Sequence, residues 1–239
     1  MEIEQSAFVL HSRPYRETSA LVTFFTPEYG KMNGVVRGVR GGRKTSSQKT
    51  ALLQPFQKLT IQWREKPNNR SDLVSIQQIE MAPLRFPLMA EANICGLYIN
   101  ELLYRLLFPQ VATETLFEIY QQTLYELLAA KQRSDQAWSL RQFEYQLLTE
   151  MGHGIQCDTD MNQQAILPDQ DYYFYPQHGA VLATLDSQKQ GVPIKGQCLL
   201  ALQDMLYCEA CLPDLKRLFR SVLSIYLGNK PIMTRELFK

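Results

Sequence analysis

Basic side chains gather in one stretch of the N-terminal third, between residues 31 and 49. This stretch reads KMNGVVRGVRGGRKTSSQK and contains six Lys or Arg residues and no Asp or Glu. Guanidinium and ammonium groups neutralise phosphates, and glycines let a backbone approach a ligand closely. The stretch could therefore bind a phosphate backbone, although a solvated surface loop can have the same composition. The residues predicted to make this contact are Lys31, Arg37, Arg40, Arg43, Lys44 and Lys49.

Catalytic residues are harder to find. The three histidines, His11, His153 and His178, lack the spacing of a metal site or a catalytic triad. The segment GVRGGRKTSS contains GRKT without the pattern that precedes it in a phosphate-binding loop. The acids are mostly isolated on expected helix faces, where a solvated surface role is favoured over a metal-dependent nuclease site. The sequence therefore favours a binding protein over an enzyme, with a nuclease or ligase-like activity as the weakest alternative.

The five cysteines are scattered and odd in number. The N-terminus has no secretory signal pattern and no apolar run reaches about 18 residues, so we expect a cytoplasmic protein with reduced thiols and no membrane span. Cys208 and Cys211 form a single CxxC, which we expect on a helix. One such pair cannot complete a tetrahedral zinc site.

The charge of the chain is unevenly distributed. The net charge is +1, yet residues 1–80 hold 12 Lys/Arg against 7 Asp/Glu, which gives +5. Residues 216–239 hold six basic residues against one acid, Glu236. Any nucleic-acid surface must therefore arise from local clustering and not from the total charge.

Two patterns divide the chain. Residues 6–11, 19–26, 31–39, 53–64 and 72–79 read as short strands with a long loop after the third. This arrangement suits a Greek-key barrel such as an OB-fold, and an SH3-like barrel fits nearly as well. From Pro83 onward, apolar residues recur at helical spacing. We therefore predict an α+β protein with a β-barrel domain over residues 1–80 and a mainly helical domain over residues 81–239, whose residues 152–196 are loop-rich and contain a small hairpin.

Aromatic residues interleave the basic region. Either Phe24 or Phe25, together with Phe56, is expected to fill the barrel, because strand aromatics usually do. Tyr15 and Tyr29 lie in turns beside basic residues and are predicted to stack on nucleic-acid bases.

Five segments, taken together and in order, resemble the RecO family of bacterial DNA repair proteins. They are AFVLHSRPYRETSALVTFFTPEYGKMNGVVRGVRG from Ala7, LQPF from Leu53, GLYINELLYRLL from Gly96, LRQFEYQLLTEMGHG from Leu140 and YLGNKPIMTRELF from Tyr226. The resemblance implies an OB-fold followed by a helical domain. It also implies binding of single- and double-stranded DNA, annealing of complementary strands, and help in loading RecA onto gaps covered by the single-strand-binding protein SSB. The implied partners are RecR and the acidic C-terminal tail of SSB, with a protein that is monomeric on its own and associated with the nucleoid.

The resemblance also assigns roles to residues. Arg13 falls in the RP..ET segment, and together with Arg16 it would extend the basic DNA-binding surface. Arg37, Arg40, Arg43 and Lys44 fall on the family's basic strand and loop. Arg141 matches a helical position associated with the SSB tail, where a cation beside Phe143 and Leu147 would suit a carboxylate-ended peptide.

One departure from the family concerns zinc. Many members carry a four-cysteine module, and this chain has Cys157, Asp160, Ala183 and Asp186 in those places. We therefore expect neither zinc nor any other cofactor, and a degenerate zinc-finger-like hairpin held by packing of Tyr172, Tyr173, Phe174, Tyr175 and Val181. A competing hypothesis makes the protein an adaptor that tethers RecR to SSB, with only incidental DNA contact.

Overall fold

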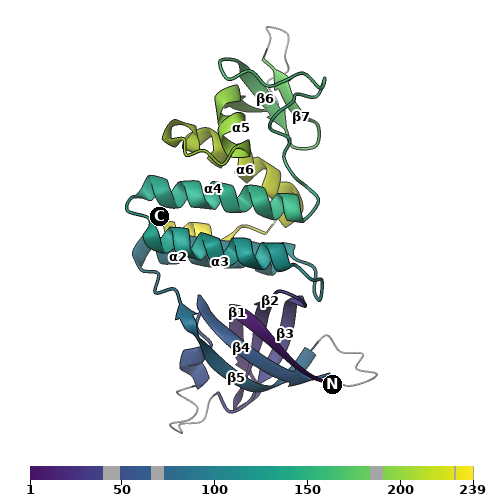
Figure 1. The fold of residues 1–239 in the computed structure, drawn as a ribbon, viewed down its shortest axis with the longest axis vertical. Helices are drawn as coiled ribbons and strands as arrows, with labels where there is room; N and C mark the ends of the chain where they lie inside the picture. The colour runs from purple at the N-terminus through teal and green to yellow at the C-terminus, as the bar shows by residue number, and fades with distance from the viewer. Residues whose placement is uncertain (40–48, 66–72, 184–190, 229, 239) are drawn as a thin grey trace. The chain divides into compact units, whose positions relative to one another are not determined.

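The computed structural model describes residues 1–39, 49–65, 73–183, 191–228 and 230–238. The chain forms two compact units (Figure 1). The barrel unit comprises Met1–Leu128 and Ile232–Lys239, and the helical unit comprises Ala129–Pro231.

Five strands build the barrel: β1 (Glu2–Tyr15), β2 (Ser19–Thr26), β3 (Gly30–Val36), β4 (Gln57–Arg64) and β5 (Leu73–Arg85). They close in the order β1-β2-β3-β5-β4, and only the β3–β5 pair is parallel. Alternate residues point inward, as the pleat of a strand requires. The interior is filled by apolar side chains that include Ala7, Val22, Phe24, Leu59 and Ile61. The five predicted strands are thus confirmed, with β1 and β5 longer than expected.

Two helices belong to the same unit, α2 (Ala90–Leu106) and α3 (Glu114–Ala129). They cover apolar side chains on the outside of the barrel: the Phe8 ring lies 5.3 Å from Phe117 and 5.0 Å from Tyr120. Asn100 of α2 donates a hydrogen bond to the carbonyl oxygen of Val9 at 3.2 Å. The boundary predicted at residue 80 falls inside β5, which runs to Arg85. The helices α2 and α3 bury the outer aromatic face of the barrel and belong to the same unit.

The connection between α2 and α3 is fixed to the turn between β2 and β3. The Gln110 amide donates to the Lys31 carbonyl and the Thr113 amide to the Pro27 carbonyl, each at 2.9 Å. Gly30 has φ 55°, and a Cβ atom there would lie 1.9 Å from the Val111 carbonyl oxygen. Only glycine permits this approach, which holds the helix pair against the strands.

The C-terminal segment η2 (Met233–Phe238) returns to α2 within the same unit. The Glu101 carboxylate accepts hydrogen bonds from the amides of Met233 and Thr234 at 2.8 and 2.9 Å, and from the Thr234 hydroxyl at 2.8 Å. Burial opposes ionisation, but these donors outweigh it and lower the pKa of Glu101.

The helical unit contains α4 (Arg133–Glu150), α5 (Gly196–Gln203), the short helix η1 (Glu209–Cys211) and α6 (Leu212–Leu227). A three-stranded sheet, ordered β7-β6-β8, is formed by β6 (Asp171–Tyr175), β7 (Gly179–Leu182) and β8 (Val192–Lys195). The β6–β7 hairpin is confirmed, and β8 was not predicted. Tyr172 and Phe174 are buried, whereas Tyr173, Tyr175 and Val181 are half-buried.

The cysteine expectations are corrected in two respects. A disulfide joins Cys198 to Cys211, so the expectation of five reduced thiols is wrong. The helix expected to carry Cys208 ends earlier, at Gln203, because Met205 takes a left-handed conformation with φ 54°. The chain then reverses and brings Cys211 to within 5.2 Å of Cys198, measured between Cα atoms.

Candidate nucleic-acid interface

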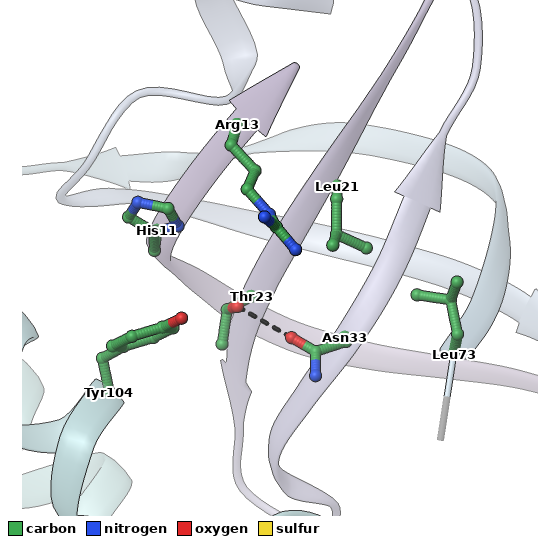
Figure 2. A pocket seen from close by; sticks show the side chains of 7 residues that line it. All are labelled: His11, Arg13, Leu21, Thr23, Asn33, Leu73 and Tyr104. Atoms are coloured by element: carbon green, nitrogen blue, oxygen red, sulfur yellow. Dashed lines mark hydrogen bonds between the residues drawn. The ribbon is translucent and has the colours of Figure 1, made fainter. Parts of the chain in front are cut away.

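The outer face of β1, β2 and β3 carries a cavity of about 230 Å³ (Figure 2). The strands contribute polar and basic groups, and α2 contributes an aromatic ring at one side. The lining residues are His11, Arg13, Leu21, Thr23, Asn33, Leu73 and Tyr104. Pockets that take a drug-sized ligand measure roughly 300–1,000 Å³, so this cavity is smaller than those pockets.

A β-bulge in β1 puts His11 and Arg13 on this face. Phe8 pairs with Phe25, and both lie outside the barrel, so unbroken alternation would place Leu10 outward and His11 inward. The register shifts between Val9 and His11, and His11 then pairs with Thr23 and Arg13 with Leu21. Because one inserted residue exchanges the two faces of a strand, the bulge is what brings both side chains to the cavity.

Within the cavity, the Thr23 hydroxyl donates to the Asn33 side-chain oxygen at 2.8 Å. The Tyr104 ring lies 5.2 Å from the His11 ring, between centroids, and Figure 2 shows it reaching from α2 toward the strands. Tyr104 is 43% exposed, so much of its surface is open to a ligand.

Lys31 supports the position of α2. Its ammonium group donates to the backbone oxygen of Tyr104 at 2.8 Å and lies 5.8 Å from the centre of the Tyr104 ring. Desolvation by burial lowers the pKa of Lys31. A phosphate contact of Lys31 would compete with its hydrogen bond to the Tyr104 backbone oxygen. The observed position of Lys31 is therefore suited to anchoring α2.

The other cations predicted to contact DNA lie around the cavity or outside the described residues. Arg13 lines the cavity, and Arg37 is exposed just beyond β3. Lys49 lies in a short helical turn and donates to the Arg37 carbonyl oxygen at 3.3 Å. The Arg16 guanidinium lies 5.3 Å from the centre of the Tyr15 ring. Arg40, Arg43 and Lys44 are outside the described residues.

Tyr29 was predicted to stack on bases, and the structure places it against the barrel interior. Its ring packs edge-on against the buried Trp63, 5.1 Å away between centroids. Burial raises the pKa of Tyr29, with smaller contributions from Glu65 and Glu28. The tyrosine that faces the cavity is Tyr104.

A second cavity in the barrel unit, of about 370 Å³, is larger but differs in charge. It presents three carboxylates and one ammonium group, and its lining residues are Ser6, Pro27, Glu28, Lys58, Glu114, Phe117, Glu118 and Gln121. A surface with excess negative charge repels a phosphate backbone. The first cavity is therefore the better candidate for nucleic acid.

In the helical unit, the residues predicted to bind the SSB tail are mostly buried. Phe143 and Leu147 have no exposed surface, so they offer none to a peptide. Arg141 is 8% exposed, and its guanidinium donates to the fully buried carboxylate of Glu144 at 2.9 Å. The guanidinium also lies 5.7 Å from the centre of the Phe219 ring.

The positions compared with the zinc module have other roles. Burial, followed by the nearby Asp158, raises the pKa of the Cys157 thiol to about 12. Asp160 accepts hydrogen bonds from the amides of Asn162 and Gln164. Asp186 is outside the described residues, and across the described ranges no three His, Cys, Asp or Glu side chains are grouped as a metal site requires.

Six of the seven lining residues were not predicted as part of a site: His11, Leu21, Thr23, Asn33, Leu73 and Tyr104. One signal in the sequence could have revealed Asn33. Asparagine is depleted from strands, so its place between Met32 and Gly34 in an apolar strand called for an explanation. His11 could not have been found, since its orientation depends on the bulge.

A closed barrel with an aromatic and cationic cavity on its outer face defines a binding protein built on a β-barrel. Two family models match the chain, "Recombination protein O N terminal" over residues 1–84 and "Recombination protein O C terminal" over residues 89–236. The chain belongs to the RecO family, and its role lies in DNA repair and recombination.

Curated relatives are similar over nearly their full length. Proteins named "DNA repair protein RecO" from Nitrosococcus oceani, Pseudoalteromonas atlantica and Pseudomonas aeruginosa are 38%, 39% and 38% identical to this chain. The matches cover 98%, 100% and 98% of this chain and 92%, 95% and 94% of those proteins. None of the described helices has the length and apolar character that a membrane crossing requires.

Proposed function

We propose that this protein is a recombination mediator that binds single- and double-stranded DNA, anneals complementary strands and helps load RecA onto SSB-covered gaps. It acts by binding and not by catalysis. Cations on the barrel would neutralise phosphates of two strands at once, which lowers the repulsion between them and lets complementary bases meet. In this proposal the barrel is an OB-fold, since its strand order and long β3–β4 connection fit that fold.

The observation that carries the proposal is the cavity on the outer face of β1–β3. It combines an exposed arginine, polar strand side chains and an exposed tyrosine, which are the groups that OB-folds use to hold a nucleic-acid strand. Contacts with RecR and with the acidic SSB tail are part of the proposal and rest on the family alone.

Charge reversal tests the proposal. The variant Arg13→Glu/Arg37→Glu removes two exposed cations from the barrel unit, and the matched control Lys131→Glu/Lys195→Glu makes the same change of charge at exposed positions of the helical unit. Fluorescence anisotropy with a labelled oligo-dT measures affinity across a salt series, and mixing of complementary strands measures annealing. If about five cations engage the strand, the slope of log K against log salt in the wild type is about −3.5.

The barrel variant should lose annealing, and its salt slope should be shallower by about 1.4, because each phosphate contact contributes about 0.7 on single strands. The control should keep both properties. Wild-type binding that does not respond to salt would overturn the proposal. If the barrel variant annealed normally and still bound RecR and the SSB tail, the adaptor hypothesis would replace it.

A further inference from the structure

We propose that the cavity lined by Tyr104 binds one unpaired nucleobase, so that the protein reads the presence of a base and not only the phosphate backbone. This inference rests on the proposed function, since it names the part of the DNA that this cavity takes. The ligand is a single base in a single strand, with its neighbouring phosphate held by Arg13.

The dimensions of the cavity favour a base over a larger group. The cavity measures about 230 Å³, which is less than a drug-sized ligand requires, and residues of β1, β2, β3, β5 and α2 line it. The strands supply its floor, α2 supplies Tyr104 at one side, and Leu73 of β5 lies at the other (Figure 2). A flat ring can therefore enter edge-first or lie against Tyr104.

The aromatic surface is held in place before any ligand arrives. Tyr104 keeps its ring beside His11, and the Lys31 bond to its backbone oxygen fixes the turn of α2 that carries it. The Gly30 approach holds the following helix connection against the same strands. Stacking on a fixed ring costs little conformational entropy and accepts every base, because each base has a π face.

Asn33 supplies a polar contact beside the ring. The hydrogen bond from Thr23 occupies its side-chain oxygen and fixes the amide plane, while the Asn33 NH₂ group makes no hydrogen bond within the described residues. That group can donate to the ring nitrogens and carbonyl oxygens that bases present as acceptors. Asn33 is half-buried, so this bond would be partly shielded from water.

Arg13 gives this cavity a positive charge that a purely apolar pocket would lack. It is exposed, lines the cavity, and has no carboxylate of the described residues within ion-pair distance. Its guanidinium can therefore take the phosphate of the base bound beside Tyr104. The combination of a ring, an amide donor and a cation matches one nucleotide.

The experiment compares two 15-nucleotide probes of equal phosphate count, oligo-dT and an abasic strand, by anisotropy with the full-length protein at one salt concentration. The wild type should bind oligo-dT about 5- to 150-fold more tightly, which corresponds to stacking of one base. Tyr104→Leu should abolish this ratio while leaving affinity for the abasic strand unchanged, and Tyr104→Phe, which keeps the ring, should restore it. Thermal melting of both variants checks that the fold is intact.

Arg13→Gln serves as the complementary variant. It should weaken the binding of both probes by the same factor and make the slope of log K against log salt shallower by about 0.7. A 2-aminopurine placed at the centre of the strand should lose fluorescence on binding to the wild type and to Tyr104→Phe, and not to Tyr104→Leu.

Two failures are distinguishable. If the wild type bound neither probe, the proposed function itself would fail. If the wild type bound both probes equally, or if Tyr104→Leu kept the preference for oligo-dT, DNA binding would stand and the base site would be overturned.

Discussion

Arg13 in the barrel unit and Arg141 in the helical unit were both predicted to bind a negatively charged partner, and their surroundings are opposite. Arg13 is exposed and lines an open cavity. Arg141 is 8% exposed and bonded to the buried carboxylate of Glu144. The same residue type, chosen from segments that resemble the same family, is available for a ligand in one unit and committed to the protein interior in the other.

The prediction for Arg141 failed because of the periodicity of a helix. Residues two apart share a face on a strand but not on a helix, where the neighbours are three or four apart. Arg141 and Phe143 are two apart on α4, so they could not form one pocket together. The pairs that helical spacing does support are Arg141 with Glu144 and Phe143 with Leu147, and the first of these is the ion pair observed.

The substitution Arg141→Ala tests this contrast and should have the largest effect on stability. Removing a cation from a buried ion pair leaves its carboxylate partner poorly compensated, which costs about 3–5 kcal/mol of unfolding free energy. The two tryptophans of the chain lie one in each unit, Trp63 and Trp138, and both are buried. Urea unfolding followed by Trp138 fluorescence in a Trp63→Phe background therefore reports on the helical unit.

Two arginine controls complete that test. Arg220→Ala, on the exposed side of α6, and Arg13→Ala, in the cavity, should each change stability by no more than about 0.5 kcal/mol. A loss below about 1 kcal/mol for Arg141→Ala would show that the ion pair is dispensable, and Arg141 would again be a candidate for an acidic peptide tail.

A second contrast between the units is covalent. The helical unit has the Cys198–Cys211 disulfide, which links two residues 13 positions apart, whereas the described cysteine of the barrel unit, Cys95, is not part of a disulfide. Such a cross-link contributes about 3 kcal/mol through the unfolded state. Dithiothreitol should therefore lower the urea midpoint of the Trp138 transition and leave that of Trp63 unchanged.

Two cysteine variants separate the effect of the disulfide from other effects of the reductant. Cys211→Ala should unfold at the reduced wild-type midpoint and should not respond further to dithiothreitol. Cys95→Ala should keep the full response of the Trp138 transition. If the wild-type transition were insensitive to the reductant, the disulfide would not contribute to stability in solution.

The sequence was sufficient for the barrel strands and the helices, because their apolar periodicities are long and regular. It failed at local irregularities. The bulge between Val9 and His11 reverses which side chains face outward, and the left-handed Met205 ends α5 early. Both depend on tertiary packing and leave no periodic signal. Of the candidate cavity, the sequence identified only Arg13, since His11 faces the cavity through the bulge and Tyr104 comes from a helix far from β1–β3 along the chain.

The smallest expected effect concerns Glu101, which holds the C-terminal segment on α2 of the barrel unit. Its pKa is lowered in the folded protein, so its contribution to stability is present above its ordinary pKa and is lost as the pH falls through the folded value. At neutral pH, Glu101→Gln should destabilise the docked segment by about 1–2 kcal/mol, because neutral hydrogen bonds are weaker than those to a carboxylate. The difference from the wild type should disappear once the pH has fallen below the lowered pKa of Glu101, where both side chains are neutral.

Hydrogen exchange of the Met233 and Thr234 amides measures this directly, since both donate to Glu101. Exchange in the Gln variant should be faster at neutral pH and equal to that of the wild type in acid, after correction for intrinsic rates. Glu118→Gln, at an exposed position of α3, is the matched control and should leave both amides unchanged. A wild-type advantage that persisted after Glu101 is protonated would mean that packing, and not the carboxylate charge, holds the C-terminal segment on α2.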